Sequence, residues 1–258
     1  MTGSLRVVTV AGSDPTGGAG LQADIKTFAA LGAHGLSVTT ALTVQTTVAV
    51  ETVVLVEPDL IARQLRAVLS DIGADAIKVG MLGSAEGVEA VAEVLEEVPA
   101  VPMVLDPVLA SSDGTPLLSP AGVAALGRRL VPRATVLTPN WPEAAVLLGT
   151  PVADDAQADV AAQRLGGLTS GAIVLTGGHG EGGVVRNRLL AEGRLTYVDA
   201  DRLKGRFHGT GCALSSALAV GLARGAGVVE ALEDAVRFVS KAMASAKRFG
   251  PGASILDL

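Results

Sequence analysis

A cysteine and two glycines stand together at the expected start of a helix. The segment reads His208-Gly209-Thr210-Gly211-Cys212 and precedes the aliphatic stretch 213–222. Glycines let backbone N–H groups approach an anion closely, and the positive end of the helix dipole favours negative charge there. We therefore expect a phosphate site over Gly209, Thr210 and Gly211. The same position should lower the pKa of Cys212 and suit it to act as a general base, although a small buried helix residue is the commoner role of a cysteine.

Four further polar residues each follow an expected strand: Asp14, Asp106, Asn140 and Thr176. In open parallel α/β sheets, ligands bind beyond the carboxyl ends of the strands. Any one of these residues could equally be a helix cap or a turn residue. Their recurrence at one edge of the sheet favours a ligand site.

Three other patterns do not support the functions that they first suggest. Residues 178–183, Gly-His-Gly-Glu-Gly-Gly, match the dinucleotide-binding pattern, but a hairpin and not a helix is expected after them. No P-loop sequence G-x-x-x-x-G-K-S/T occurs. The three histidines, His34, His179 and His208, are scattered and lack metal-ligand spacing. We therefore expect neither a Rossmann-type site, nor a P-loop, nor a histidine-based metal site.

Alternating strands and helices must position these residues, and the hydrophobic pattern predicts them. Strands are expected over 7–11, 36–44, 52–56, 76–79, 101–105, 135–137 and 172–175. Helices are expected over 21–32, 61–69, 88–95, 143–148, 156–165, 210–224 and 228–248, and one more begins at Ser119-Pro120. Asp59 and Ser84 are the expected caps of the helices over 61–69 and 88–95. Residues 184–190 and 194–198 are typical of an antiparallel hairpin turning at Glu192-Gly193. No repeat or linker interrupts this pattern, so we expect residues 1–258 to form one α/β domain with a mostly parallel sheet.

The composition removes several classes of protein. The 258 residues carry 20 basic and 26 acidic side chains, 49% are hydrophobic and only 2% are aromatic. This acidic balance and the few aromatic rings argue against a nucleic-acid partner. One cysteine cannot build a disulfide framework, which favours a reducing compartment. No apolar run approaches the ~20 residues of a membrane span, and Met1 to Leu5 lack the features of a signal peptide, so we expect a cytoplasmic protein without a membrane partner.

Several motifs occur together and in one order along residues 6 to 250. They are the segment 11–24 (AGSDPTGGAGLQAD), Val44-Gln45-Thr46, Lys78-Val79-Gly80-Met81-Leu82, Leu105-Asp106-Pro107-Val108, Leu117-Leu118-Ser119-Pro120, Thr138-Pro139-Asn140 with Pro142-Glu143, Gly177-Gly178-His179 and His208 to Cys212. As a set, they resemble the hydroxymethylpyrimidine/phosphomethylpyrimidine kinases of thiamine biosynthesis. So many ordered motifs are far more specific than any one of them.

The resemblance implies a three-layer α/β/α ribokinase-like fold and phosphate transfer from ATP with Mg²⁺. The implied substrates are 4-amino-5-hydroxymethyl-2-methylpyrimidine and then its monophosphate, which becomes the diphosphate. A homodimer is also implied.

The resemblance also implies roles for individual residues. Gln45 would hydrogen-bond the pyrimidine edge, because a side-chain amide offers both a donor and an acceptor. Cys212 would face the hydroxymethyl group, within an anion hole formed by Gly209 to Cys212. The implied pocket residues are Gly12, Asp24, Met81 and Val108; those near Mg²⁺ are Asp106, Asn140 and Glu143; and those on the nucleotide side are Asn140, Thr176 and Gly178.

Two departures from the family pattern concern positive charge near the transferred phosphate. Thr176 stands where the family commonly has a lysine before Gly-Gly-His, and Arg206-Phe207 replace the usual Asn-Thr. A lost cation weakens stabilisation of the transition state. We expect Lys204 or Arg206 to replace it, in which case Arg206→Ala would lower turnover more than it weakens pyrimidine binding.

Two alternative functions remain open. A pyridoxal or pyridoxine kinase has the same fold and also phosphorylates a heteroaromatic hydroxymethyl group. Gln45 and Cys212 favour the pyrimidine. A pyrimidine-binding regulator without catalysis is suggested by Thr176, whereas Asp106, Glu143 and Cys212 argue against it.

Overall fold

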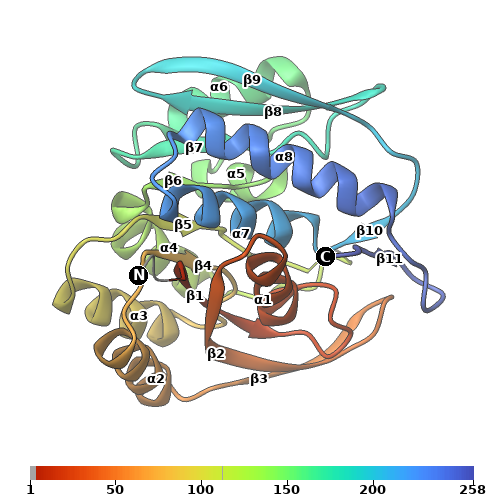
Figure 1. The fold of residues 1–258 in the computed structure, drawn as a ribbon. Helices are drawn as coiled ribbons and strands as arrows, with labels where there is room; N and C mark the ends of the chain where they lie inside the picture. Colours follow the sequence, from red (N-terminus) through yellow and green to blue (C-terminus); the bar gives the residue numbers. More distant parts are fainter. Residues whose placement is uncertain (1–3, 112) are drawn as a thin grey trace.

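The computed structural model describes residues 4–111 and 113–258, and within them a nine-stranded sheet forms the middle of the molecule (Figure 1). Its strands run in the order β3-β2-β1-β4-β5-β6-β7-β8-β9. They are β1 Arg6–Ser13, β2 His34–Gln45, β3 Val50–Leu55, β4 Ala76–Val79, β5 Met103–Leu105, β6 Val136–Leu137, β7 Ala172–Leu175, β8 Val184–Ala191 and β9 Arg194–Asp201. Six neighbouring strands, β2, β1, β4, β5, β6 and β7, are parallel to one another. Strands β3, β8 and β9, at the two edges of the sheet, pair antiparallel.

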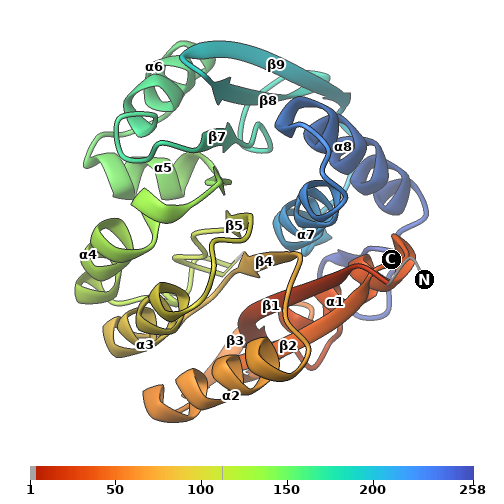
Figure 2. The same ribbon diagram turned by 60° about the vertical axis from the view of Figure 1, so that its left-hand side comes forward.

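Helices cover both faces of the sheet (Figure 2). One layer comprises α2 Pro58–Asp71, α3 Ala85–Glu97, α4 Pro120–Arg129, α5 Trp141–Leu148 and α6 Asp155–Leu165; the other comprises α1 Gly20–Ala30, α7 Thr210–Ala223 and α8 Val228–Ala244. A short second sheet pairs β10 Phe207–His208 with β11 Ser254–Ile255. The expected three-layer α/β/α arrangement is therefore confirmed.

The aliphatic strands are buried because both of their faces meet helices. In β1, Val8 and Val10 pack toward the α2–α6 layer, and Val7 packs toward α1, α7 and α8. Adjacent side chains of a strand point to opposite faces, so a strand covered on both sides must be apolar along its whole length. This accounts for a sequence rich in aliphatic residues and poor in amphipathic strands.

The local predictions are mostly confirmed. Ser84 and Ser119 cap α3 and α4 by accepting hydrogen bonds from the backbone N–H groups of Gly87 and Gly122. The hairpin of β8 and β9 turns at Glu192-Gly193, where both residues have positive φ (51° and 74°), as expected for a two-residue turn.

Three predicted details are wrong. Asp59 does not cap α2, which begins at Pro58 after Glu57, because proline suits the first helical position. The strand predicted from Val101 begins only at Met103, after Pro102, which has no N–H to donate. Helix α8 ends at Ala244 and does not reach Arg248, because Lys247 instead forms a β-bridge with Ile255.

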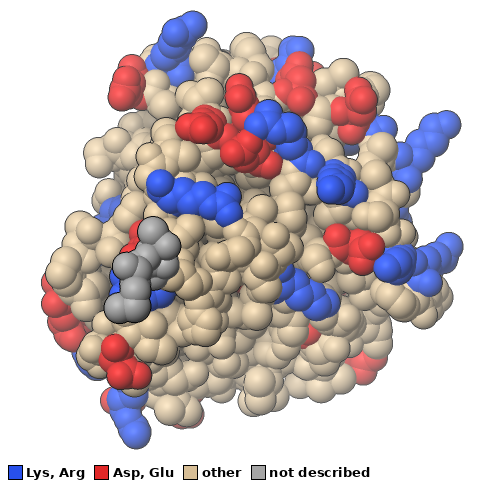
Figure 3. All heavy atoms as spheres, in the orientation of Figure 1, with Lys and Arg blue, Asp and Glu red and all other residues tan. Residues whose placement is uncertain are grey.

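The surface carries charges of both signs. On the face shown in Figure 3, lysine and arginine side chains are interspersed with aspartate and glutamate side chains. Within residues 4–111 and 113–258, no helix is both long and apolar enough to cross a membrane. Residues 1–3, part of the segment considered for a signal peptide, lie outside these ranges.

Candidate active site

A cavity of about 540 Å³ lies at the carboxyl ends of β1, β4 and β5. Most of the predicted site residues meet there, although they come from segments far apart in the chain. They are Gly12, Gln45, Met81, Asp106, Val108, Asn140, Glu143, Gly209, Thr210, Gly211 and Cys212. A second cavity, of about 330 Å³, is lined by Asn140, Thr176, Gly178, Thr210 and Gly211 among others. Because the first turn of α7 lines both cavities, a phosphate could pass between their occupants at this point.

The start of α7 is built for close approach of the backbone. Gly209 precedes the helix with φ of 82°, and no side chain caps the first turn. A Cβ atom at position 209 would lie 1.7 Å from the carbonyl oxygen of Gly18, so only glycine fits. The uncapped N–H groups and the positive helix end are features that an anion site requires, and the phosphate site expected here stays a prediction.

The predicted low pKa of Cys212 is wrong. Although the residue is partly exposed, desolvation raises the pKa of its thiol to about 12. Lys78 lowers this pKa, but the carboxylates of Asp24 and Asp106 raise it further. The pKa-lowering effect expected from the helix start is therefore outweighed by burial of the thiol and by the negative charges of two carboxylates, which only the fold brings near Cys212.

Asp24 does not line the cavity, contrary to the expectation from the family pattern. It is fully buried, and its carboxylate accepts hydrogen bonds from Thr9 Oγ1 at 2.6 Å and Ser216 Oγ at 2.7 Å. Its third partner is Lys78, whose Nζ lies 3.0 Å from Oδ2. Asp24 is thus separated from any substrate and forms part of the support beneath α7.

Lys78 is a site residue that the sequence reasoning missed. It is fully buried, lines the larger cavity, and places Nζ 3.9 Å from Asp106 Oδ2. The carboxylates of Asp24 and Asp106 raise the pKa of Lys78 far above its ordinary value despite burial, so the side chain is a permanent cation. A charged residue within the otherwise aliphatic strand β4 was the signal that could have identified it.

Asp106 and Glu143 form a pair of buried carboxylates. Asp106 accepts a hydrogen bond from Ser215 Oγ at 3.0 Å. Glu143 and Asn140 cap α5 reciprocally: the Glu143 carboxylate accepts from the Asn140 N–H at 2.8 Å, and the Asn140 side chain accepts from the Glu143 N–H at 2.9 Å. Burial and the neighbouring Asp106 raise the pKa of Glu143 to about 8, and burial raises that of Asp106.

This carboxylate pair fits a hard divalent cation. Two adjacent buried carboxylates resist ionising together, and a cation of charge +2 would relieve that cost. Among the described residues, no group of three or more His, Cys, Asp or Glu side chains is arranged to hold a metal ion. Asp106 and Glu143 would therefore need phosphate oxygens or waters to complete a coordination shell, which is how Mg²⁺ is usually held beside nucleotides.

The cations predicted from the sequence do not lie at the site. Lys204 and Arg206 are exposed, and neither lines either cavity. Arg202 lines the smaller cavity instead, and its guanidinium donates to the carbonyl oxygens of Gly178 at 2.9 Å and Gly182 at 3.0 Å. Sequence reasoning missed Arg202 because no motif includes it. Only the fold brings Arg202, which follows β9, into contact with the glycine-rich segment 177–183.

This architecture is that of the ribokinase-like kinases. The chain belongs to the phosphomethylpyrimidine kinase family, whose model matches residues 14–257. A hydroxymethylpyrimidine/phosphomethylpyrimidine kinase of Escherichia coli is 42% identical over 253 residues, which cover 97% of this chain and 95% of the relative. The family resemblance stated from the motifs is thereby confirmed.

Solved structures place two activities on the same fold. A phosphomethylpyrimidine kinase from Clostridium difficile has a TM-score of 0.82 and 33% identity, covering 93% of this chain and 100% of the other. A pyridoxal kinase from Staphylococcus aureus in complex with AMP-PCP and pyridoxal has a TM-score of 0.91 and 30% identity, covering 99% and 93%. The fold alone therefore does not choose between a pyrimidine and a pyridoxal substrate.

Proposed function

We propose that this protein transfers phosphate from ATP to 4-amino-5-hydroxymethyl-2-methylpyrimidine, and then to the resulting monophosphate, in thiamine biosynthesis. One observation carries the proposal: Gln45 and Cys212 line the same cavity as the first turn of α7. Gln45 would read the ring edge, Cys212 would face the hydroxymethyl group, and the helix start would hold the transferred phosphate. Met81 and Val108 supply apolar walls for a flat ring.

The nucleotide would occupy the smaller cavity, against Asn140, Thr176 and Gly178. There the glycine-rich segment is held by Arg202, which also brings positive charge to this side. Phosphate transfer depends mainly on positioning and on neutralising charge. Arg202, the α7 helix start and Lys78 together provide positive charge on both sides of the reacting phosphate, in place of the lysine that position 176 lacks.

In the first transfer, the hydroxyl oxygen attacks the terminal phosphorus of ATP, the bond from that phosphorus to the bridging oxygen of ADP breaks, and Cys212 takes the hydroxyl proton. Cys212 must be a thiolate to do so. Mg²⁺, held by Asp106 and Glu143 directly or through water, would supply positive charge that offsets one of the two carboxylates raising the pKa of Cys212. Lys78 favours the thiolate from within the protein.

The second transfer needs no base, because the phosphate of the monophosphate is already an anion near neutral pH. The decisive experiment measures ADP release with the pyrimidine, its monophosphate and pyridoxine in parallel, with analysis of the products. Release with the first two, ending in the diphosphate, is the expected result. Binding of the pyrimidine without ADP release would instead support a regulator that has lost catalysis.

A pyridoxal kinase activity is the second candidate, because the S. aureus pyridoxal kinase shares the fold over 99% of this chain. Gln45 and Cys212 favour the pyrimidine. A catalytic efficiency for pyridoxine equal to or above that for the pyrimidine would reverse this preference.

We further propose that residues 1–258 act as one cytoplasmic kinase domain and that two copies form a homodimer. Leu42, Val44 and Val54 project from one face of the β2–β3 pair, where Leu42 is opposite Val54, and each is at least 52% exposed. An apolar face of this kind favours burial against another protein. Light scattering of the wild type and of a Val54→Glu variant would measure the number of copies.

A further inference from the structure

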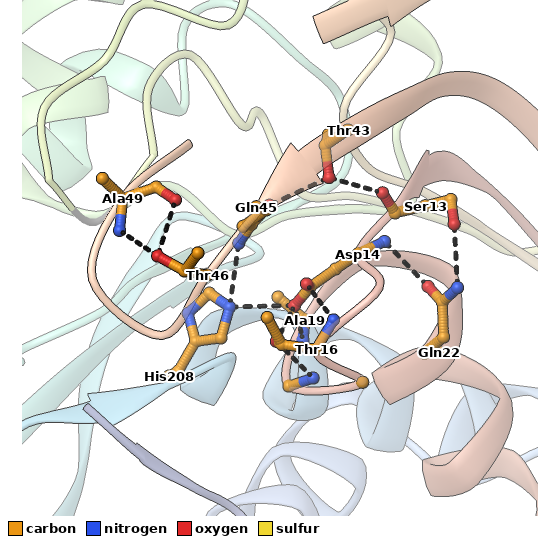
Figure 4. Close-up of polar contacts among 12 residues, drawn as sticks. Ser13, Asp14, Thr16, Ala19, Gln22, Thr43, Gln45, Thr46, Ala49 and His208 are labelled. Carbon is orange, nitrogen blue, oxygen red and sulfur yellow. Dashed lines mark hydrogen bonds and ion pairs between the residues drawn. The ribbon is translucent and has the colours of Figure 1, made fainter. Parts of the chain in front are cut away.

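The amide of Gln45 is held between two polar side chains (Figure 4). Its amide nitrogen lies 3.1 Å from Nε2 of His208, and its amide oxygen lies 3.3 Å from Oγ1 of Thr43. Gln45 ends β2, whereas His208 belongs to β10 at the far end of the chain. The side chain that would read the substrate is therefore positioned by a residue 163 positions away.

The carboxylate of Asp14 determines what His208 can do. Asp14 is buried and accepts hydrogen bonds from the Thr16 N–H at 2.9 Å, the Thr16 hydroxyl at 2.9 Å and the Ala19 N–H at 2.8 Å. Burial opposes its ionisation, but the hydrogen bonds from His208 and Thr16 outweigh burial and lower its pKa. Since an ionised carboxylate only accepts, Nε2 of His208, 2.9 Å away, must carry a hydrogen and donate it.

This donor in turn decides the orientation of the Gln45 amide. Nε2 of His208 has a single hydrogen and no lone pair, so it cannot accept from the amide nitrogen of Gln45 that lies 3.1 Å away. Turning the amide over places the Gln45 carbonyl oxygen on that side, where it shares with Asp14 the one hydrogen of Nε2. The amide nitrogen then faces Thr43 Oγ1, which can accept because its own hydrogen goes to the Ser13 carbonyl oxygen at 2.9 Å. In this arrangement each contact along the chain Asp14–His208–Gln45–Thr43 joins a donor to an acceptor.

We propose that Asp14 and His208 are positioning residues that fix the amide of Gln45 and thereby select the substrate. The amide, held in this way, offers the cavity its second N–H and a free carbonyl lone pair. That pair matches a ring nitrogen next to an exocyclic amino group, which the aminopyrimidine has and pyridoxine lacks. The proposal rests on the proposed function and extends it from the residue that reads the ring to the residues that orient it.

The fold brings His208 to this place by close packing. A Cβ atom at Gly18 would lie 2.5 Å from Cδ2 of the His208 ring, so the glycine admits the ring against the loop of residues 14–19. The backbone of His208 pairs with Ile255 of β11. The C-terminal strand and the loop after β1 thus hold the histidine in place, which is expected of a rigid positioning group and not of a mobile one.

A double-mutant cycle tests the proposal. His208→Leu removes the N–H donor, and His208→Gln offers a side-chain N–H in its place. Each is made in the wild type and in Gln45→Ala, with His34→Ala as an exposed histidine control. Direct binding of the aminopyrimidine and of pyridoxine is measured by calorimetry without nucleotide, and the KM for ATP is measured separately.

We expect His208→Leu to weaken aminopyrimidine binding about 10-fold, the effect of one lost hydrogen bond, with little change for pyridoxine or in the KM for ATP. His208→Gln should recover most of the loss, and His208→Leu should add little once Gln45 is absent. If His208→Leu weakened aminopyrimidine binding equally in the wild type and in Gln45→Ala, or weakened binding of both ligands equally, this inference would be overturned. The proposed function would still stand. Absence of aminopyrimidine binding by the wild type would overturn the proposed function and this inference with it.

Discussion

The ammonium group of Lys78 lies 3.0 Å from Oδ2 of Asp24, and neither side chain is exposed to solvent. Asp24 also accepts from Ser216 of α7, and Asp106 accepts from Ser215 of the same helix. A buried cation therefore balances two carboxylates directly under the turn that carries Cys212. The position of this turn and the charge around it therefore depend on the same group of side chains.

Replacing Lys78 should destabilise the protein strongly. Lys78→Met leaves buried carboxylates without their cation, and breaking such a pair costs about 3–5 kcal/mol in the free energy of unfolding. Urea unfolding would measure this loss. Arg66→Ala, which breaks the exposed pair with Glu97, is the control and should cost no more than about 1 kcal/mol. A loss for Lys78→Met as small as that of the control would contradict the prediction, and Asp24→Asn added to Lys78→Met should recover part of the loss.

Cys212→Ala should separate the two phosphorylation steps. The first step removes a proton from a hydroxyl group, for which a general base contributes roughly 10²–10⁴-fold, whereas the second uses an oxygen that is already ionised. We expect kcat for the pyrimidine to fall by such a factor and kcat for the monophosphate to fall much less. Steady-state assays with each substrate give the two values. Equal losses in both steps would mean that Cys212 does not act as the base.

The raised pKa of Cys212 predicts slow alkylation of the ligand-free protein. With a pKa of about 12, only a small fraction is thiolate at pH 8, and each unit of pH adds about tenfold until the pKa is approached. Labelling by iodoacetamide, followed by mass spectrometry, should therefore keep accelerating up to at least pH 10. Cys212 is the one cysteine of the sequence, so the urea-unfolded chain serves as the control and should react much faster at pH 8. Equal rates in the folded and unfolded states would refute the raised pKa.

Glu143→Gln should weaken the response to Mg²⁺ without unfolding α5. Glutamine can replace glutamate in a capping box, so the hydrogen bond to the Asn140 N–H is kept while the negative charge is lost. We expect the Mg²⁺ concentration for half-maximal activity to rise about 10-fold or more, with a Tm within a few degrees of the wild type. An unchanged Mg²⁺ dependence would exclude Glu143 from the metal site.

Arg202→Ala should act on the nucleotide and not on the pyrimidine. Without its hydrogen bonds to Gly178 and Gly182, the glycine-rich segment would lose its fixed position beside the smaller cavity. An increase of about 10-fold in the KM for ATP is expected, with the KM for the pyrimidine unchanged. Arg194→Ala, at the exposed turn of the same hairpin, is the matched control. If both variants behaved alike, Arg202 would have no specific role.

The sequence by itself determined the fold class, most of the strands and helices, and the set of residues of which most line one cavity. These features are local or repeat a family pattern: an aliphatic run between turns becomes a buried strand, and glycines before an apolar stretch become an open helix start. The ends of parallel strands then meet at one edge, which explains why Asp106, Asn140 and Thr176, predicted from their positions after strands, each line at least one of the two cavities.

Only the tertiary structure decided the charge state and the support of that site. The pKa of Cys212 follows from desolvation and from Lys78, Asp24 and Asp106, which lie on three other segments of the chain. For the same reason Asp24 is a buried partner of Lys78 and not a pocket residue, and Arg202 lines the smaller cavity whereas Lys204 and Arg206 do not. A local pattern indicates which residues stand at a strand or helix end, but burial and charge act through space and depend on neighbours that only folding brings together.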